Sequence, residues 1–258
     1  MKGKTPPLGG GVSPVTDYAG LAQEYARHRK VHPAVLRDLL QESGIYAQSS
    51  VLEVGCGTGN YTLALESTVG SPCWGMDPSE EMLAEASEGP GSVHFQVGRA
   101  EQLEFSTGFF DLAFSVDVIH HLEDIARYFQ EAFRILKPGG RVCTVTDSEW
   151  IIRHREPLAV YFPESVDVDL ARYPRLRELR ALKRDAGFAE LSEHTVEFPY
   201  ELRDAQAYRD RAFSSVFLIG EGAWRRGLER IERDLQTGSI SCISRYVLLW
   251  GTRQATSH

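Results

Sequence analysis

The amino-acid sequence predicts an α/β fold in which a parallel β-sheet carries helices on both faces. Two observations lead to this prediction. Between residues 50 and 146, short β-rich runs alternate with stretches of helical periodicity, an order typical of βαβ units. A glycine-rich turn, "GCGTG" at 55–59, connects the first β-rich run with the first helical stretch. With 42% hydrophobic residues in a chain of 258, a substantial core is expected.

Each element of this block is predicted in chain order from its periodicity. The strands are expected in "SVLEVG", "PCWGMD", "SVHFQVG", "FDLAFSV" and "RVCTVTD", and the helices in "GNYTLALEST", "SEEMLAEAS" and "EDIARYFQEAFRILKPGG". The proline and glycine pair that close the last helix predict a tight turn into the fifth strand.

The flanking segments extend the block into one expected domain, residues 16–258, after a flexible Gly- and Pro-rich lead-in at 1–15. Residues 16–49 predict two helices broken at Pro33. After residue 146 we expect a helix in "ELRALKRDAGF", a strand in "AELSEHTVEF", helices in "DAQAYRDRAFSS" and "EGAWRRGLERIERDL", and a final β-rich run, "SCISRYVLLWG", at 241–251.

Composition disfavours several functional classes. No apolar stretch is long enough to span a bilayer, and the first residues lack the apolar segment of a signal peptide. The four cysteines form no CxxC pair, which favours a reducing cytoplasm over a zinc site or a disulfide framework. The net charge of −8 disfavours a nucleic-acid partner, and the arginines of "RYPRLRELRALKR" are interpreted as the solvated face of a helix.

The glycine-rich turn predicts a nucleotide-like ligand. The dinucleotide fingerprint GxGxxG would require glycine at position 60, where the chain has Asn60, and no phosphate-binding GxxxxGK[ST] loop is present. Glu53, an acid inside the strand before Gly55, suits a cationic ligand. Asp77 ends the second β-rich run and could accept both ribose hydroxyls, a role common to nicotinamide and adenosyl cofactors.

Four stretches taken together resemble the class I S-adenosylmethionine-dependent methyltransferases, especially the ubiquinone/menaquinone-type and trans-aconitate-type branch (methyltransferase type 11 like). They are "VLEVGCGTG", "GMDPSEEML", "GRAEQLEFSTGFFDLAFSVDVIHHLED" and "EAFRILKPGGRVCTV". The resemblance covers residues 25 to about 146 in order. It implies a Rossmann-like, seven-stranded, mostly parallel sheet, with an antiparallel last strand beside the fifth and a helical cover inserted after the fifth strand.

The resemblance also implies S-adenosyl-L-methionine as cofactor, S-adenosyl-L-homocysteine as product, and no metal. Glu53 would hold the network near the amino group, Asp77 the ribose, and Pro78 and Met82 the adenine. Arg99 stands where the family usually has an aspartate, so the adenine contact is expected from Ala100 and Glu101. The full set of expected cofactor-binding residues is Tyr25, Arg29, Glu53, Gly55, Cys56, Gly57, Gly59, Asp77, Pro78, Met82, Ala100, Glu101 and Ser115.

A sulfonium is already an activated methyl donor, so the enzyme needs only to align an acceptor and, for some acceptors, to remove a proton. Candidate bases follow the fourth and fifth strands, where an open parallel sheet presents its ligand crevice: Asp117, His120, His121, Asp147 and Glu149. For any one of them, a local structural role is the favoured interpretation. Adjacent histidines point to different faces, which argues against a metal pair.

Acceptor specificity is expected in residues 147–240, outside the shared motifs. This region is rich in aromatic side chains that could cover the crevice, namely Trp150, Tyr161, Phe162, Tyr173, Tyr208, Phe213, Phe217 and Trp224. The alternative, that most of them form the core of the region itself, is expected to hold for more than half.

Three functional hypotheses follow. The first is methyl transfer from S-adenosylmethionine to a small-molecule acceptor. The second is a catalytically inactive cofactor-binding protein that works through a partner. The third, a nicotinamide oxidoreductase, is disfavoured by Asn60. Oxygen, nitrogen, carbon and sulfur all stay open as the methylated atom.

Overall fold

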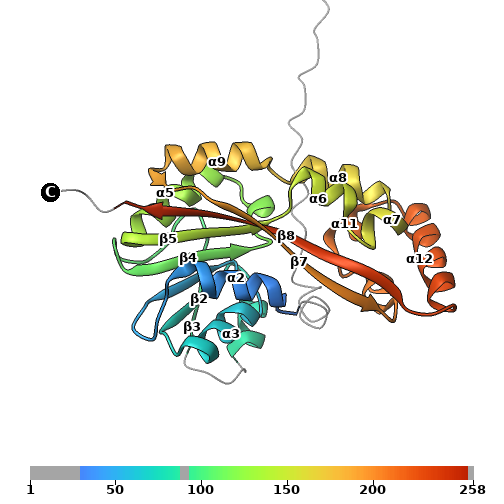
Figure 1. Ribbon diagram of the computed structural model, residues 1–258, viewed down its shortest axis with the longest axis horizontal. Coiled ribbons are helices and arrows are strands. Elements are labelled where there is room, and N and C mark those ends of the chain that lie inside the picture. Colours follow the sequence, from blue (N-terminus) through green and yellow to red (C-terminus); the bar gives the residue numbers. More distant parts are fainter. Residues whose placement is uncertain (1–29, 88–92, 255–258) are drawn as a thin grey trace, which may run out of the picture.

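The computed structural model describes residues 30–87 and 93–254 and has one mixed β-sheet at its centre (Figure 1). The strand order is β3-β2-β1-β4-β5-β8-β6, and β7 also pairs with β8. The first five strands are parallel, while β8 is antiparallel to β5. The strands are β1 (Val51–Val54), β2 (Cys73–Asp77), β3 (His94–Val97), β4 (Phe110–Val116), β5 (Leu136–Thr146), β6 (Phe188–Ala189), β7 (Glu193–Leu202) and β8 (Ile240–Arg253).

The predicted Rossmann-like sheet is confirmed, because β6 and β7 are two pieces of one sixth strand. Phe188 pairs with Arg253 of β8, and Glu193 pairs with Leu249. The interruption at 190–192 contains Glu190, whose φ is +50°. The sheet therefore has seven strand positions, and its last strand lies antiparallel beside the fifth, as expected.

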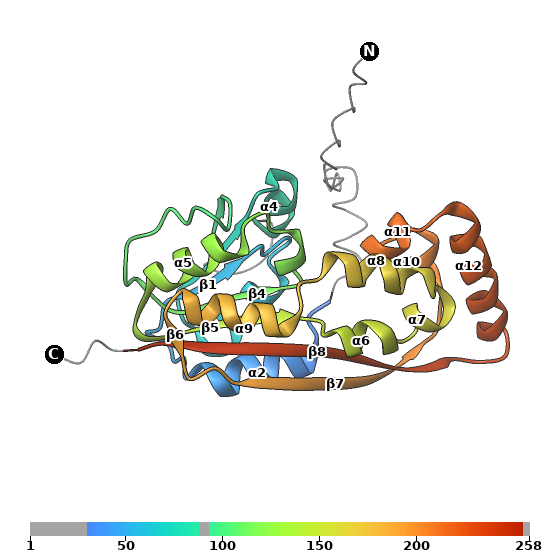
Figure 2. The same ribbon diagram turned by 90° about the horizontal axis from the view of Figure 1, so that it is seen from above.

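Helices cover both faces of the sheet (Figures 1 and 2). Residues of α5 (Ile125–Ile135) and α9 (Leu176–Asp185) share one buried apolar cluster with Leu52 of β1. Residues of α2 (Pro33–Ser43) and α3 (Asn60–Val69) share a second with Val51, the neighbour of Leu52. Burial on both faces explains why the strands of a parallel sheet are apolar almost throughout. A further helix, α4 (Glu80–Ser87), packs beside β2 and β3.

A group of helices, here called the helical cover, lies on the right in Figure 1, beyond the ends of β4 and β5 and beside the right-hand parts of β7 and β8. The prediction placed this cover after the fifth strand, and the structure has it there as two separate insertions. The first, between β5 and β6, contains α6 (Glu149–His154), α7 (Leu158–Tyr161) and α8 (Glu164–Arg172). The second, between β7 and β8, contains α10 (Gln206–Arg209), α11 (Ser214–Leu218) and α12 (Glu221–Leu235). The two insertions meet because they share a third apolar cluster, separate from the two that flank the sheet.

Two local predictions need correction. We expected "LKPGG" to be a turn between helix and strand, but β5 already begins at Leu136, which pairs with Phe110. The register then shifts so that Arg141 pairs with Leu112, which makes 137–140 an irregular bulge. "DAQAYRDRAFSS" forms two short helices, α10 and α11, rather than one.

At the N-terminal side, the second of the two helices expected around Pro33 is present as α2. It begins at Pro33, and the His32 side chain caps it by accepting a hydrogen bond from Val35 N. The first expected helix and the lead-in at 1–15 lie outside the described residues. Within 30–87 and 93–254, no helix is long and apolar enough to cross a membrane.

Candidate functional site

The glycine-rich turn connects β1 to α3 at the carboxyl end of the parallel strands. Gly55, Gly57 and Gly59 have φ angles of +71°, +54° and +74°, a conformation that side chains strongly disfavour. A Cβ at Gly55 would overlap the Val118 side chain, whereas a Cβ at Gly57 would have no atom of residues 30–87 and 93–254 within 4 Å. As far as these residues are concerned, the space above Gly57 is open, and the loop presents bare backbone to it.

The loop is joined to β2 by backbone and side-chain hydrogen bonds. Gly55 N and Cys56 N both donate to Met76 O, at 2.7 and 3.0 Å. Asp77, the last residue of β2, accepts from Gly57 N on Oδ2 and from Ser79 N on Oδ1, each at 2.9 Å. Burial raises the pKa of Asp77, and these two amide donors oppose the shift. Each carboxylate oxygen keeps a second lone pair for another donor.

Glu53 is a buried acid in β1 beneath the loop. Its carboxylate accepts a hydrogen bond from the hydroxyl of Thr62 in α3. Burial raises the pKa of Glu53 to about 8, and the nearby charge of Asp77 adds to the increase. A cationic group brought close to Glu53 would favour its ionised form.

The segment after β3 contains the residues expected at the adenine. Ala100 and Met82 are buried, whereas Pro78 is exposed. Glu101 uses one carboxylate oxygen to accept from Glu123 N at 3.1 Å and keeps the other 3.7 Å from Arg99 Nε. Arg99 also pairs with Glu123 at 2.9 Å. Arg99, which replaces the usual acid, is therefore a partner of two glutamates.

Two expected site residues lie at the end of β4: Ser115 within the strand and Asp117 directly after it. Ser115 is buried and accepts a hydrogen bond from the hydroxyl of Tyr128 in α5, at 3.3 Å. Asp117 has a φ of +58°, unusual for a residue with a side chain. Its Oδ2 accepts from the Tyr246 hydroxyl at 2.9 Å, and its backbone N donates to Val145 O at 3.1 Å.

At the end of β5, Asp147 belongs to a buried ion network. Its Oδ2 pairs with Arg155, which also pairs with Asp169 of α8 at 3.1 Å. Burial opposes the charge of Arg155, but the surrounding acids raise its pKa above the usual value, with Asp147 contributing most. Sequence reasoning missed Arg155 and Asp169 because they lie outside the shared motifs.

The other candidate bases have different surroundings. His120 stacks on Tyr173 with ring centroids 3.9 Å apart. His121 is exposed, and Glu149 lies 3.9 Å from Arg175 Nε. Within the described part of the chain, no group of three or more His, Cys, Asp or Glu side chains is arranged to hold a metal. Tyr25 and Arg29, expected at the methionine end, lie outside that part.

The comparisons with known proteins agree with this arrangement. Residues 52–144 match the family described as "Methyltransferase domain". The chain is 30% identical over 150 residues to a probable chloroplastic tocopherol O-methyltransferase of Oryza sativa subsp. japonica, which covers 54% of this chain and 41% of that protein. It is 28% identical over 218 residues to a demethylmenaquinone methyltransferase of Geobacillus kaustophilus, covering 80% of this chain and 88% of that protein.

Solved structures show the same fold. The crystal structure of the YcgJ protein from Bacillus subtilis superposes with a TM-score of 0.61 at 22% identity, covering 87% of this chain and 100% of that one. The matched family segment contains the glycine-rich turn and Asp77, and the sheet is mostly parallel with the predicted antiparallel last strand beside the fifth. Residues 52–144 therefore form a methyltransferase domain, and the chain has the fold of the class I S-adenosylmethionine-dependent methyltransferases.

Proposed function

We propose that this protein transfers a methyl group from S-adenosylmethionine to a small-molecule acceptor. The observation that carries the proposal is the open loop at Gly57, held by Asp77 and underlain by the buried acid Glu53. When bound, S-adenosylmethionine supplies a methyl group on a positively charged sulfur, already activated for transfer.

The residues of the loop fit this cofactor. Each carboxylate oxygen of Asp77 accepts one backbone amide, from Gly57 N or Ser79 N, and can accept a ribose hydroxyl on its remaining lone pair. Glu53 supplies the negative charge that a ligand with an amino group requires. Any side chain at Gly57 would occupy the open space above the backbone. Gly55, Cys56 and Gly59 would shape the loop, while Pro78, Met82 and Ala100 would contact the adenine.

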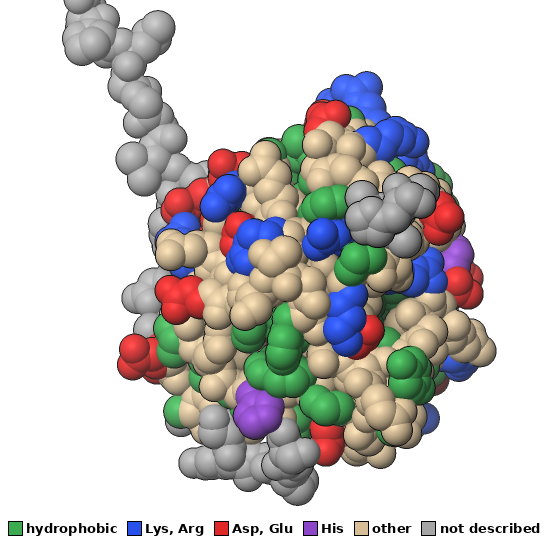
Figure 3. Space-filling view, turned by 90° about the vertical axis from the view of Figure 1, so that its left-hand side faces the viewer, with side chains coloured by type: hydrophobic (Ala, Val, Ile, Leu, Met, Phe, Trp, Pro, Cys, Tyr) green, Lys and Arg blue, Asp and Glu red, His purple; other side chains and the backbone are tan. Residues whose placement is uncertain are grey.

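The acceptor would meet the methyl group near the ends of β4 and β5. Asp147 is a poor base, because its carboxylate is ion-paired with the buried Arg155. Asp117 and His120 are the better candidates if a proton must be removed. Two relatives are named for tocopherol and demethylmenaquinone, which supports a small-molecule acceptor. Figure 3 shows Lys and Arg interspersed with Asp and Glu on the face that it draws, a pattern that offers little attraction to a phosphate backbone.

We also propose a cytoplasmic location and acceptor selection by residues 147–240. All four cysteines are buried and free, which suits a reducing compartment. The helical cover lies at the end of the sheet toward which β4 points (Figure 1), and this position supports its role in holding the acceptor.

Ligand-dependent thermal unfolding tests the proposal. S-adenosylhomocysteine should raise the melting midpoint and NAD should not, since only a ligand of the native state stabilises it. A shift with NAD alone would favour an oxidoreductase. Mass spectrometry of small molecules retained during purification gives an independent answer. Tight S-adenosylhomocysteine binding, with no methyl transfer to any member of a metabolite library, would favour the non-catalytic alternative.

A further inference from the structure

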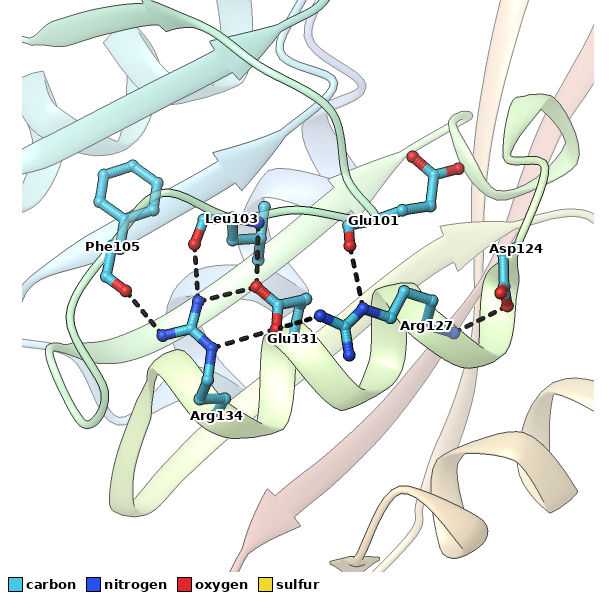
Figure 4. Close-up of polar contacts among 7 residues, drawn as sticks. All are labelled: Glu101, Leu103, Phe105, Asp124, Arg127, Glu131 and Arg134. Carbon is cyan, nitrogen blue, oxygen red and sulfur yellow. Dashed lines mark hydrogen bonds and ion pairs between the residues drawn. The ribbon is translucent and has the colours of Figure 1, made fainter.

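The segment that follows β3, residues 99–105 and here called loop 99–105, is held by charged side chains of α5 (Figure 4). Three residues of that helix contact the loop backbone, and we call them the α5 clamp: Arg127, Glu131 and Arg134. Apart from the isolated bridge between Arg99 and Gln102, no regular strand pairing holds this loop. Its backbone groups therefore need other hydrogen-bond partners.

The clamp supplies hydrogen-bond partners to both backbone groups of Leu103, its N–H and its carbonyl oxygen. Glu131 Oε2 accepts from Leu103 N at 3.0 Å, and Arg134 Nη2 donates to Leu103 O at 2.6 Å. Arg134 Nη1 donates to Phe105 O at 2.7 Å. Arg127 Nε donates to Glu101 O at 3.3 Å. One face of α5 thus holds the backbone of three loop residues.

Electrostatics keep the clamp ionised. Glu131 is buried and lies between two guanidinium groups, 2.7 Å from Arg134 Nη2 and 3.4 Å from Arg127 Nη2. The hydrogen bonds from Arg134 hold the pKa of Glu131 below its usual range, despite burial. Charge-assisted hydrogen bonds of this kind are stronger than neutral ones.

We propose that the α5 clamp positions loop 99–105 for the cofactor and thereby sets cofactor affinity. The proposal rests on the proposed function, since Ala100 and Glu101 would lie against the adenine. Glu131 and Arg134 are positioning residues that act through the loop backbone. The Arg99 side chain cannot accept a hydrogen bond from the adenine amine. Adenine binding in this chain therefore depends more on the loop backbone than it would with an acidic side chain at position 99.

The test uses graded variants of the full-length protein. Glu131→Ala removes the acceptor for Leu103 N and the charge between the arginines. Glu131→Gln keeps an acceptor oxygen but loses the charge, and it remains informative if the alanine variant does not fold. Leu179→Ala is the control, because Leu179 is buried in the same apolar cluster on α9 and its loss destabilises the fold without removing a loop contact.

Hydrogen exchange measures how well the Leu103 amide is protected, and calorimetry with S-adenosylhomocysteine measures cofactor affinity. Loss of charge-assisted bonds should speed exchange of the Leu103 amide and raise the dissociation constant by about tenfold in Glu131→Ala, with a smaller effect in Glu131→Gln. Leu179→Ala should change the Leu103 exchange rate and the dissociation constant much less, even where it lowers the free energy of unfolding as much as the Glu131 variants do.

Unchanged Leu103 exchange in both Glu131 variants overturns the proposal, as does unchanged affinity with a faster-exchanging loop. An equal loss of affinity in Leu179→Ala would show a general stability effect and would also overturn it. If the wild-type protein does not bind S-adenosylhomocysteine, the proposed function fails, and the exchange experiment still decides whether the clamp holds the loop.

Discussion

Glu53 and Asp77 are two acids at the glycine-rich turn that differ in burial: Glu53 is buried and Asp77 is half-buried. Burial raises the pKa of both. Asp77 accepts two backbone amide hydrogen bonds, which stabilise its ionised form. Burial dominates at Glu53, so its pKa reaches about 8 although hydrogen bonds with Thr62 lower it. We therefore expect Glu53 to couple ligand binding to proton release near neutral pH.

Affinity for S-adenosylhomocysteine should increase as the pH rises from about 6.5 to about 8.5, because the ligand's ammonium group favours ionised Glu53 and binding releases its proton. Calorimetry in buffers of different ionisation enthalpy measures both the affinity and the protons released. Glu53→Gln should remove most of this pH dependence. The same pH dependence in the glutamine variant would exclude Glu53 as its source.

The pH dependence of stability provides a second readout of Glu53. The folded-state pKa of about 8 lies above the usual 4.5, so the folded protein binds the proton more tightly than the unfolded chain does. This contribution to the free energy of unfolding is complete below pH 4.5 and is lost as the pH rises through about 8. Urea denaturation should therefore show less loss of stability over this range in Glu53→Gln.

Asp77→Ala should weaken S-adenosylhomocysteine binding by about tenfold or more, because hydrogen bonds from the ribose hydroxyls to a charged group contribute about 1.5–3 kcal/mol each. Asp77→Asn should give a smaller loss, since its amide keeps one acceptor oxygen. Calorimetry measures the affinity, and the melting midpoint verifies folding. Wild-type affinity in a folded alanine variant would remove Asp77 from the site.

At the scale of elements, the β1–α3 turn combines glycines with different roles. Gly55 lies against Val118, so both its backbone conformation and its packing require glycine. Gly57 has the same left-handed backbone, but no atom of the part of the chain that the structure describes lies within 4 Å of its Cβ position. One substitution at each position separates the stability of the turn from its capacity to bind.

Gly57→Ala should cost about 1–2 kcal/mol for its positive φ and should abolish S-adenosylhomocysteine binding, because the new methyl group stands in the open space. Gly55→Ala should cost more stability, since its Cβ also overlaps Val118. Urea denaturation gives the first quantity and calorimetry the second. If Gly57→Ala binds the ligand like the wild type, the open space is not the ligand site.

At the scale of the whole molecule, the helical cover has an apolar core of its own. Tyr161, Phe162 and Tyr208, three of the aromatics expected over the crevice, are buried in that core. Trp150 and Phe217 are exposed instead. The Asp147, Arg155 and Asp169 network joins the cover to the end of β5. The cover can therefore be disturbed through its packing without altering the glycine-rich turn.

Gly227→Ala should loosen the cover and leave S-adenosylhomocysteine affinity unchanged. A Cβ there would overlap the Phe162 ring and lie 2.6 Å from Tyr161 O, and overpacking of this kind costs about 1–3 kcal/mol. Limited proteolysis of residues 149–235 measures the loosening. Gly222→Ala is the control on the same helix, where a Cβ would meet only Arg226 Nη1 at 3.5 Å. A loss of ligand affinity in Gly227→Ala alone would assign the cover to the cofactor site.

Short-range sequence patterns predicted the parallel strands and the glycine-rich turn, whereas the antiparallel last strand was expected from the family resemblance. The strands and helices follow from periodicity, which depends on neighbours a few residues apart. The GCGTG turn and Asp77 follow from the spacing of adjacent elements. α12 was predicted from its helical pattern over its full length, Glu221–Leu235.

Contacts between distant segments were decided only by the tertiary structure. The Tyr246 hydroxyl reaches Asp117 across 129 positions of the sequence, and Arg134 reaches Leu103 across 31. The carboxylate of Glu101, which is expected at the adenine, accepts a hydrogen bond from Glu123 N, 22 positions away. The sequence by itself predicted the strands and helices of the motif block and the loop that can approach a ligand, because turn chemistry and periodicity act locally. It did not predict the bulge at 137–140, the short helices α6, α7 and α8, or the division of 204–215 into α10 and α11. Which charged side chains meet, and which aromatics of the cover are buried, depended on how the elements pack, since only packing brings residues far apart in the chain within hydrogen-bond distance.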